Sequence, residues 1–487
     1  MSEATLIKDL SQIVGASNIQ TGSVGTKRFR TGFRSGEGEA EAVVIPGTLL
    51  EMWRVLQTCV QAGRIIIMQA ANTGLTEGST PNGDYDRNVI IVNTLRLDRI
   101  HLIKNGLQIV SHPGSTLFQL EKLLKPLGRE PHSVIGSTSI GASIVGGVCN
   151  NSGGALTQRG PAYTELALYA QVVGDGELRL VNHLGIELGT TPEEILENLE
   201  RGQFTEADVS EDVGRASDDG YQDKVRDVTA STPSRYNADP DRLFEVSGSA
   251  GRLAVFAVRL DTYPAIEEER AYYIGTNDPA DLTVLRRRIL TECEKLPICG
   301  EYIHRTLFKV ARKYGKDTLM MIHWLGTDRL PKLFAMKGFL DAYLSKVSFL
   351  PRNLVDRVMQ ALSHLIPEPL PKRILDWHSR YEHHLILKVE PDSAGVIEKI
   401  LTDVLGKDGW FACTKEEAVK AMLHRFAAAG SAVRYQAVHA NEVEDVIALD
   451  IALARNDENW LETLPEEIEK DLVAKLYYGH FFCHVFH

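Results

Sequence analysis

Histidines and arginines in the last quarter of the chain have the side-chain types that acid–base and carboxylate chemistry require. His480, His484 and His487 lie in the final stretch, YYGHFFCHVFH. Imidazole accepts protons near neutral pH and binds borderline divalent metals. In one evenly pleated strand, however, residues seven apart point to opposite faces, so ordinary core or surface histidines are the alternative. His383 and His384 could also supply a base, although neighbouring strand histidines are more often structural.

Arg425 and Arg434 flank FAAAGSAV, a run of small residues that indicates a turn. A guanidinium near a cleft can bind a substrate carboxylate through two parallel hydrogen bonds. The alternative is an ordinary surface ion pair with Glu442 or Glu444.

A loop of small residues follows a short apolar strand within Ile65–Asn82, IIIMQAANTGLTEGSTPN. Small residues let main-chain N–H groups approach a ligand, and a concave row of such donors suits a pyrophosphate. No G-x-G-x-x-G is present here and no P-loop lysine follows, so neither usual nucleotide fingerprint applies. An ordinary glycine-rich turn is the alternative.

A second stretch of the same kind, Gly136–Gly154, reads GSTSIGASIVGGVCNNSGG and contains six glycines. It too presents backbone and few bulky side chains. Two such loops on strand-rich scaffolds could hold one extended dinucleotide from two sides.

Composition excludes several classes of protein. With 487 residues and 44% hydrophobic content, the chain can form two to four domains. It has no apolar run long enough to span a membrane and no signal-peptide pattern at its start. Six cysteines without C-x-x-C spacing indicate reduced thiols, and a net charge of −12 argues against nucleic-acid binding.

Charge is unevenly distributed along the chain. Residues Arg305–Glu382 carry 14 lysines and arginines against 7 acids, a local charge of +7, so the rest carries −19. Aromatic and aliphatic residues alternate with these cations, which suits an anionic lipid surface. A solvated basic face over a small core is the alternative.

Hydrophobic periodicity predicts an α+β protein with helices and strands at short intervals. Helices are expected at 4–16, 49–62, 117–124, 282–293, across much of 392–429, and at 443–455 and 465–476. Strands are expected at 42–46, 65–68, 89–92, 109–110, 167–173, 178–181, 253–260, 272–276, 383–389, 435–438 and 477–487. The polar, acidic segment 193–241 is expected to be a long surface excursion.

Several long motifs resemble the bacterial quinone-dependent D-lactate dehydrogenases, peripheral membrane flavoenzymes with a vanillyl-alcohol-oxidase-type FAD fold. They are AANTGLTEGSTPNGDYDR from Ala70, PLGREPHSVIGS from Pro126, CNNSGGALTQRGPAYTE from Cys149, RYNADPDRLFE from Arg235, HRFAAAG from His424, RYQAVH from Arg434 and LYYGHFFC from Leu476. The likeness covers nearly the whole chain.

The resemblance implies a two-subdomain PCMH-type FAD-binding domain at 1–263, with its core at about 36–208. An α+β cap domain would occupy 264–305 and 383–487. A basic, mainly helical membrane-binding insertion would occupy 306–382. The family continues beyond His487, so the cap is expected to be truncated.

The resemblance also implies site residues. The FAD contacts would be Ala70, Ala71, Asn72, Thr73, Gly74, Gly78, Ser79, Thr138, Val145, Ala155 and Ala257. The catalytic residues would be His480, His487 and Arg425. Gly479-His480 and His487 match the spacing of a paired-histidine metal site in related dehydrogenases, but we assign no metal ligand.

The implied reaction is oxidation of D-lactate to pyruvate by hydride transfer to flavin N5, with electrons passed to a membrane quinone. The implied location is the cytoplasmic face of the bacterial inner membrane, on anionic phospholipid. The alternatives are an FAD dehydrogenase for another D-2-hydroxyacid, or a non-catalytic flavin-fold protein that binds membranes.

Overall fold

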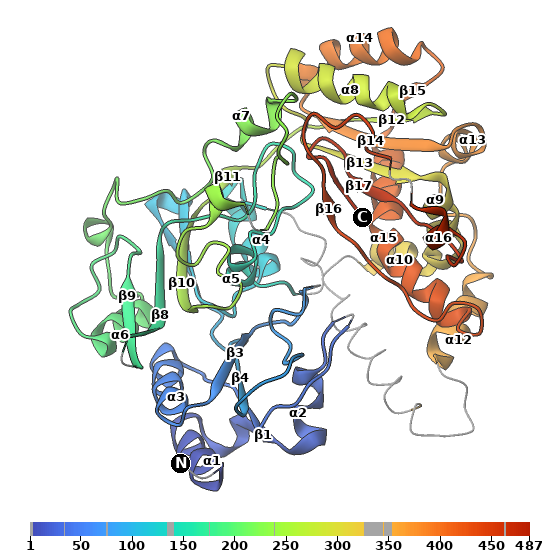
Figure 1. Ribbon diagram of the computed structural model, residues 1–487. Helices are drawn as coiled ribbons and strands as arrows, with labels where there is room; N and C mark the ends of the chain where they lie inside the picture. The colour runs from blue at the N-terminus through green and yellow to red at the C-terminus, as the bar shows by residue number, and fades with distance from the viewer. Residues whose placement is uncertain are drawn as a thin grey trace. The chain divides into compact units, whose positions relative to one another are not determined.

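The computed structural model describes residues 3–33, 35–74, 76–133, 141–174, 176–237, 239–325, 344, 353–461 and 464–487. The chain forms two compact units (Figure 1). The first comprises Met1–Gly154, Pro161–Asp219 and Asn237–Ala265, and the second comprises Ala155–Gly160, Gly220–Tyr236 and Ile266–His487. Each unit has sheets and hydrophobic clusters of its own.

The first unit begins with a four-stranded sheet in the order β1-β2-β4-β3. Its strands are β1 (Ile19–Thr21), β2 (Ala42–Val44), β3 (Ile65–Gln69) and β4 (Val89–Asn93). The last three run parallel, and their nearly continuous apolar sequences are typical of strands covered on both faces. Helices α1 (Glu3–Val14), α2 (Gly22–Arg30) and α3 (Leu49–Gln61) surround this sheet. The expected helices at 4–16 and 49–62 and the expected strands at 42–46, 65–68 and 89–92 are confirmed, whereas β1 and α2 were not predicted.

A five-stranded antiparallel sheet completes the first unit, in the order β5-β6-β10-β8-β9. Its strands are β5 (Ile100–Ile103), β6 (Gln108–Ser111), β8 (Ala167–Val173), β9 (Glu177–Asn182) and β10 (Ala254–Asp261). β8 and β9, both expected as strands, pair with each other in antiparallel fashion. Helices α4 (Leu117–Leu124) and α5 (Ile144–Cys149) bury their apolar residues against this sheet. The short strands β7 (Arg129–Glu130) and β11 (Tyr263–Pro264) form a separate pair.

The acidic segment 193–241 is not simply a surface excursion. It contains most of α6 (Pro192–Arg201), in the first unit, and α7 (Tyr221–Arg226), in the second. Leu196 and Leu199 of α6 are buried, as are Tyr221 and Val225 of α7. The expectation is therefore wrong for these helices, because apolar residues spaced for one helix face lie among the acids.

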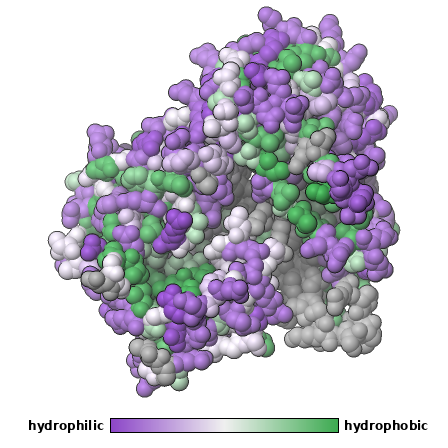
Figure 2. All heavy atoms as spheres, in the orientation of Figure 1, coloured by the Kyte–Doolittle hydropathy of each residue, from purple (hydrophilic) through white to green (hydrophobic). Residues whose placement is uncertain are grey.

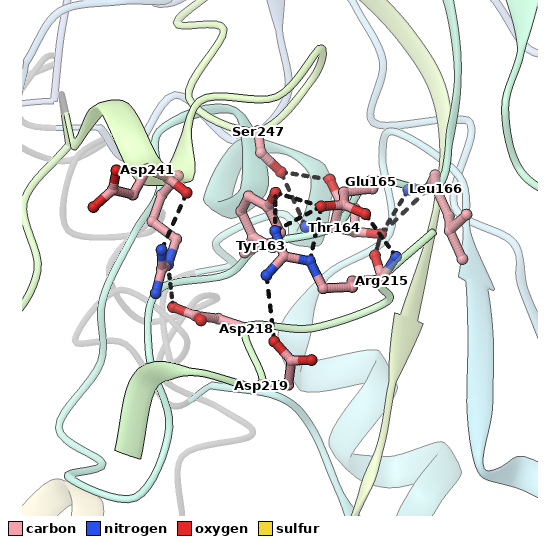
Figure 3. Close-up of polar contacts among 10 residues, drawn as sticks. Tyr163, Thr164, Glu165, Leu166, Arg215, Asp218, Asp219, Asp241 and Ser247 are labelled. Carbon is pink, nitrogen blue, oxygen red and sulfur yellow. Dashed lines mark hydrogen bonds and ion pairs between the residues drawn. The ribbon is translucent and has the colours of Figure 1, made fainter. Parts of the chain in front are cut away.

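Arg215 anchors the part of this segment that follows α6 (Figure 3). Its main-chain N–H donates to Glu165 Oε2 at 2.9 Å, and its Nε donates to Glu165 Oε1 at 2.8 Å. The hydroxyl of Tyr163 also donates to Glu165 Oε1, at 2.9 Å. Beside them, Ser247 Oγ donates to the carbonyl oxygen of Thr164 at 2.7 Å. These contacts hold the GPAYTE sequence against two later parts of the first unit.

The second unit is built on a seven-stranded sheet in the order β15-β12-β14-β13-β17-β18-β16, in which every pairing is antiparallel. Its strands are β12 (Arg270–Thr276), β13 (Cys299–His304), β14 (His383–Val389), β15 (Trp410–Ala412), β16 (Ile451–Ala452), β17 (Tyr478–His480) and β18 (Val485–Phe486). The expected strands at 272–276 and 383–389 are confirmed.

Helices cover both faces of this sheet. Tyr272 and Leu385 point to the face covered by α8 (Pro279–Glu292) and α14 (Ala394–Leu405). Tyr273 and Ile386 point to the opposite face, covered by α9 (Arg305–Tyr314), α13 (Lys372–Arg380) and α15 (Lys415–Val438). The central strands are apolar without alternation because successive side chains are buried on opposite sides.

Four expectations in the C-terminal part are wrong or only partly right. The FAAAGSAV sequence and residues 435–438 belong to the 24-residue helix α15, not to a turn and a strand. Alanine has the highest helix propensity, and a Thr414–Glu417 capping box starts this helix. Residues 443–455 form no helix and contain β16, and only α16 (Glu466–Glu469) forms within 465–476.

The described part of the basic segment 306–382 is mainly helical. It contains most of α9, together with α10 (Lys316–Leu325), α12 (Leu354–Ser363) and α13. Much of its predicted cation-aromatic pattern, including Lys332, Phe334 and Lys346, lies outside the described residues. Among the described helices, none is long and apolar enough to cross a membrane. Figure 2 shows mostly hydrophilic residues on the visible face, with smaller hydrophobic clusters.

Candidate active site

Two amide side chains shape the loop that follows β3 in the first unit. Asn72 has a left-handed backbone conformation (φ 53°), which asparagine tolerates well. Its Nδ2 donates to the carbonyl oxygen of Thr31 at 2.9 Å, and its Oδ1 accepts from Ser79 Oγ at 2.8 Å. Gln69 Nε2 donates to the carbonyl oxygens of Phe29 and Ser79, at 2.7 and 2.8 Å. The two amides therefore tie both ends of the loop together and to the segment before β2.

The main-chain donors of this loop are available to a ligand. Within the described residues, seven predicted FAD-contact residues donate no main-chain hydrogen bond: Ala70, Ala71, Asn72, Thr73, Gly74, Gly78 and Ser79. A Cβ atom built on Gly74 or Gly78 meets no atom within 4 Å, so open space lies in front of both. Free N–H groups beside open space suit the diphosphate of a dinucleotide. The predicted FAD contacts of this loop stay predictions.

The other predicted FAD contacts also stay predictions. Thr138 lies outside the described residues. Val145 is buried in the short helix α5, where Ser143 caps the first turn by accepting from the N–H of Gly146 at 3.1 Å. Ala257 is buried in β10, next to a β-bulge that interrupts the pairing with β8. Ala155 belongs to the second unit.

The second unit brings together two of the three predicted catalytic residues around a buried glutamate. Glu301, on β13, is only 3% exposed. His480 Nδ1 lies 2.7 Å from Glu301 Oε1, and Arg425 Nη2 lies 2.8 Å from Glu301 Oε2. The guanidinium carbon of Arg425 also lies 4.3 Å from the centroid of the Tyr478 ring. One carboxylate thus holds both an imidazole and a guanidinium.

A tight hairpin places His487 beside His480. The final stretch is not one strand: β17 and β18 pair through residues 481–484, where His484 has a left-handed φ of 57°. The rings of His480 and His487 lie 5.4 Å apart and nearly perpendicular, and His487 Nδ1 contacts the carboxylate of Asp450. The objection that residues seven apart point to opposite faces therefore does not hold. His484 is buried and its Nδ1 lies 2.8 Å from the carbonyl oxygen of Ala454.

Burial and charge set the protonation of this cluster. Burial lowers the pKa of His480 below its ordinary value, although the Glu301 carboxylate opposes that shift. Burial alone would raise the pKa of Glu301, but its interactions with His480 and Arg425 outweigh burial, so its pKa is lowered. A neutral imidazole beside an ionised carboxylate donates through Nδ1–H, which leaves the Nε2 lone pair to accept a proton.

The other arginine and the other histidines have structural environments. Arg434 is buried in α15 and pairs with Asp317 and Asp356, not with Glu442 or Glu444. His383 and His384 are buried in β14. The hydroxyl of Tyr302 lies 2.8 Å from His383 Nδ1, and the ring of His384 lies within 5.9 Å of Tyr273, Phe308 and His378.

Glu301 was not predicted from the sequence, although a signal was present. It is the acid in CGEYIH, an otherwise apolar or aromatic strand, and glutamate is almost never fully buried unless it is paired. Among the described residues, no group of three or more histidine, cysteine, aspartate and glutamate side chains has the geometry to hold a metal ion.

Comparisons with known proteins identify the family and the fold. Residues 40–181 match the family model of an FAD binding domain, and residues 271–487 match the model "D-lactate dehydrogenase, membrane binding". The fold resembles a 4-ethylphenol oxidase from Gulosibacter chungangensis, with a TM-score of 0.53 at 12% identity over 89% of this chain and 72% of that one. It also resembles an alkyldihydroxyacetonephosphate synthase, with a TM-score of 0.51 at 10% identity over 88% of this chain and 64% of that one.

The fold and the FAD binding domain define an FAD-binding protein with the PCMH-type fold. A quinone-dependent D-lactate dehydrogenase from Escherichia coli (strain K12) is 58% identical over 99% of this chain and 85% of its own length. A protein of the same name from Haemophilus influenzae is 53% identical over 100% of this chain and 87% of its own length. Another, from Corynebacterium glutamicum, is 44% identical over 99% of this chain and 85% of its own length. The chain belongs to the quinone-dependent D-lactate dehydrogenase family.

Proposed function

We propose that this protein oxidises D-lactate to pyruvate and delivers the two electrons to a membrane quinone. The observation that carries the proposal is the cluster of His480 and Arg425 on the buried carboxylate of Glu301, found in a chain of this family. The cluster offers the two groups that a 2-hydroxyacid needs, a proton acceptor for its hydroxyl and a cation for its carboxylate.

Each predicted catalytic residue has a definite role in this proposal. Arg425 binds the carboxylate of D-lactate and orients the molecule. His480 takes the hydroxyl proton at Nε2 as the C2–H bond breaks. His487, whose ring lies 5.4 Å from that of His480 and whose Nδ1 contacts Asp450, limits the position of the reacting hydroxyl.

FAD, when bound, supplies the acceptor for the C2 hydrogen, which leaves with its electron pair as a hydride to flavin N5. Its diphosphate would be held by the N–H groups of the loop after β3, from Ala70 to Gly74 and at Gly78 and Ser79. Thr138, Val145, Ala155 and Ala257 would provide further contacts. Because the donors belong to the main chain, the side chains at these positions affect FAD binding mainly through their size.

The flavin spectrum of the purified holoenzyme tests the activity directly. Under anaerobic conditions D-lactate should bleach the flavin absorbance, and a soluble quinone analogue should restore it. D-2-hydroxyglutarate serves as the competing substrate, and L-lactate as the control for stereochemistry. Faster bleaching by D-2-hydroxyglutarate would favour a dehydrogenase for a larger hydroxyacid, and a flavin that no hydroxyacid bleaches would favour a non-catalytic protein.

We further propose that the protein consists of an FAD-binding domain at 1–263, a cap domain at 264–305 and 383–487, and a lipid-binding insertion at 306–382. A specific feature supports the insertion's role. Val358, Leu362 and Leu365 are 48%, 57% and 82% exposed and are spaced for one face of α12 and the turn after it. With the local excess of lysine and arginine, this face suits the anionic cytoplasmic leaflet of a bacterial inner membrane.

Co-sedimentation with vesicles tests the lipid surface. Binding should require anionic lipid and should weaken as salt rises, because exposed charges are screened within about 10 Å at 0.1 M ionic strength. Leu362→Asp with Leu365→Asp should reduce binding about tenfold or more. Val396→Asp, which changes an exposed residue on α14, is the matched control and should not. Equal binding to neutral vesicles would contradict the proposed lipid class.

A further inference from the structure

Glu301 contacts both residues to which the proposed function gives a direct chemical role. It accepts from His480 Nδ1 at 2.7 Å with one oxygen and pairs with Arg425 Nη2 at 2.8 Å with the other. Its side chain is 4% exposed and that of Arg425 is 8% exposed, so water competes little for either interaction. A buried carboxylate of this kind orients its partners more strongly than an exposed one.

Three elements converge on this carboxylate. Glu301 on β13 lies directly opposite His480 on β17 in the antiparallel register, so the main-chain ladder fixes the spacing of the two side chains. Arg425 approaches from α15, and its guanidinium is also held over the ring of Tyr478, two residues before His480. Within the described residues, the buried Nε of Arg425 has no hydrogen-bond partner, which leaves a donor for another carboxylate.

We propose that Glu301 is the positioning residue of D-lactate oxidation, which holds His480 with its Nε2 free as the base and holds Arg425 ready to bind the substrate carboxylate. This inference rests on the proposed function. It predicts that a single change at Glu301 weakens two separate steps, proton transfer and substrate binding. A residue that only stabilised the fold would instead reduce the fraction of active enzyme and leave KM unchanged.

Steady-state kinetics of the FAD-loaded enzyme on D-lactate test this inference, with Glu301→Gln and Glu301→Asp as the variants. In Glu301→Gln the amide no longer balances Arg425 and no longer selects the Nδ1–H tautomer. We expect kcat to fall about 10- to 100-fold, the range known for hydrogen-bonding partners of metal-binding histidines, and KM to rise about tenfold. Glu301→Asp keeps the charge and should recover part of both losses. The inhibition constant of pyruvate should rise with KM, because both report binding at Arg425.

Glu382→Gln is the matched control, because Glu382 pairs with His304 at 3.3 Å on an exposed part of the same unit. Its kcat and KM should stay within about twofold of the parent. If Glu301→Gln does not fold, as judged by its melting temperature and flavin content, Glu301→Asp decides alone. Full kcat and KM in the folded Glu301 variant would overturn the inference. A parent enzyme whose flavin D-lactate does not reduce would instead refute the proposed function.

Discussion

The imidazole rings of His378 and His384 lie parallel inside the second unit, with their centroids 5.9 Å apart and their planes within 3° of each other. The centroid of the Phe308 ring lies 4.2 Å from that of His378, 5.4 Å from that of His384 and 4.2 Å from that of His424. Burial lowers the pKa of His378 to about 4 and that of His424 to about 3, and it lowers the pKa of His384 well below its ordinary value. The three imidazoles are therefore neutral at pH 7.

We expect this cluster to make the second unit sensitive to acid. Because the unfolded chain takes up protons near pH 6.5 and the folded chain does not, stability is fully present above about pH 6.5 and is lost as pH falls toward 4. Each group contributes a slope of about 1.4 kcal/mol per pH unit in that window. The melting temperature should depend less steeply on pH in His424→Phe than in the parent. His183→Gln changes an exposed histidine, so it is the control and should keep the slope of the parent. Equal slopes in the two variants would contradict the expected role of the buried cluster.

Gly74→Val and Gly78→Val should lose FAD while keeping the fold. The new side chain has room in the protein itself, because a Cβ at either position meets no atom within 4 Å and neither residue has a left-handed φ. It would occupy the space that we assign to the diphosphate. We expect the affinity for FAD to fall about 100-fold or more, measured by titrating apoprotein and following flavin fluorescence.

Gly174→Val is the control for this pair, since it too adds a side chain to open space in the first unit, in the turn after β8. It should bind FAD like the parent. If all three variants retain full flavin occupancy, the loop after β3 is not the diphosphate site.

Arg434→Met should destabilise the second unit by about 3–5 kcal/mol, because it removes the cation that pairs with the buried carboxylate of Asp317. The matched change, Arg312→Met, removes an exposed ion pair with Glu368 and should cost less than about 1 kcal/mol. Urea unfolding of the two variants measures both values. Similar midpoints would show that the Arg434 pairs contribute no more than surface ion pairs.

Much of the fold could be predicted because buried strands and helices have apolar residues at regular spacing in the sequence. The apolar run at Val89–Asn93 and the apolar spacing within Leu117–Leu124 gave the right element types from local residues alone. The run FAAAGSAV did not, because a stretch of small residues favours a turn by composition and a helix by propensity. The 24-residue length of α15 decides between them, and that length depends on packing against the sheet of the second unit.

The candidate site was predicted in its parts but not in its connections. His480 and Arg425 were identified by chemical type and family resemblance. Glu301, which links them, is 179 positions from His480, and only strand register brings the two together. The proximity of His480 to His487 likewise depends on a four-residue hairpin loop that the apolar sequence did not reveal.

The proposed proton transfer also depends on the register in which β13 pairs with β17. Side chains alternate between the two faces of a sheet, so a slip of a single position would carry the His480 imidazole to the far side of the sheet. It would bring a neighbour without a titratable imidazole, Gly479 or Phe481, opposite Glu301 instead. Ordinary amide hydrogen bonds between two short strands thus determine whether a proton acceptor exists at all.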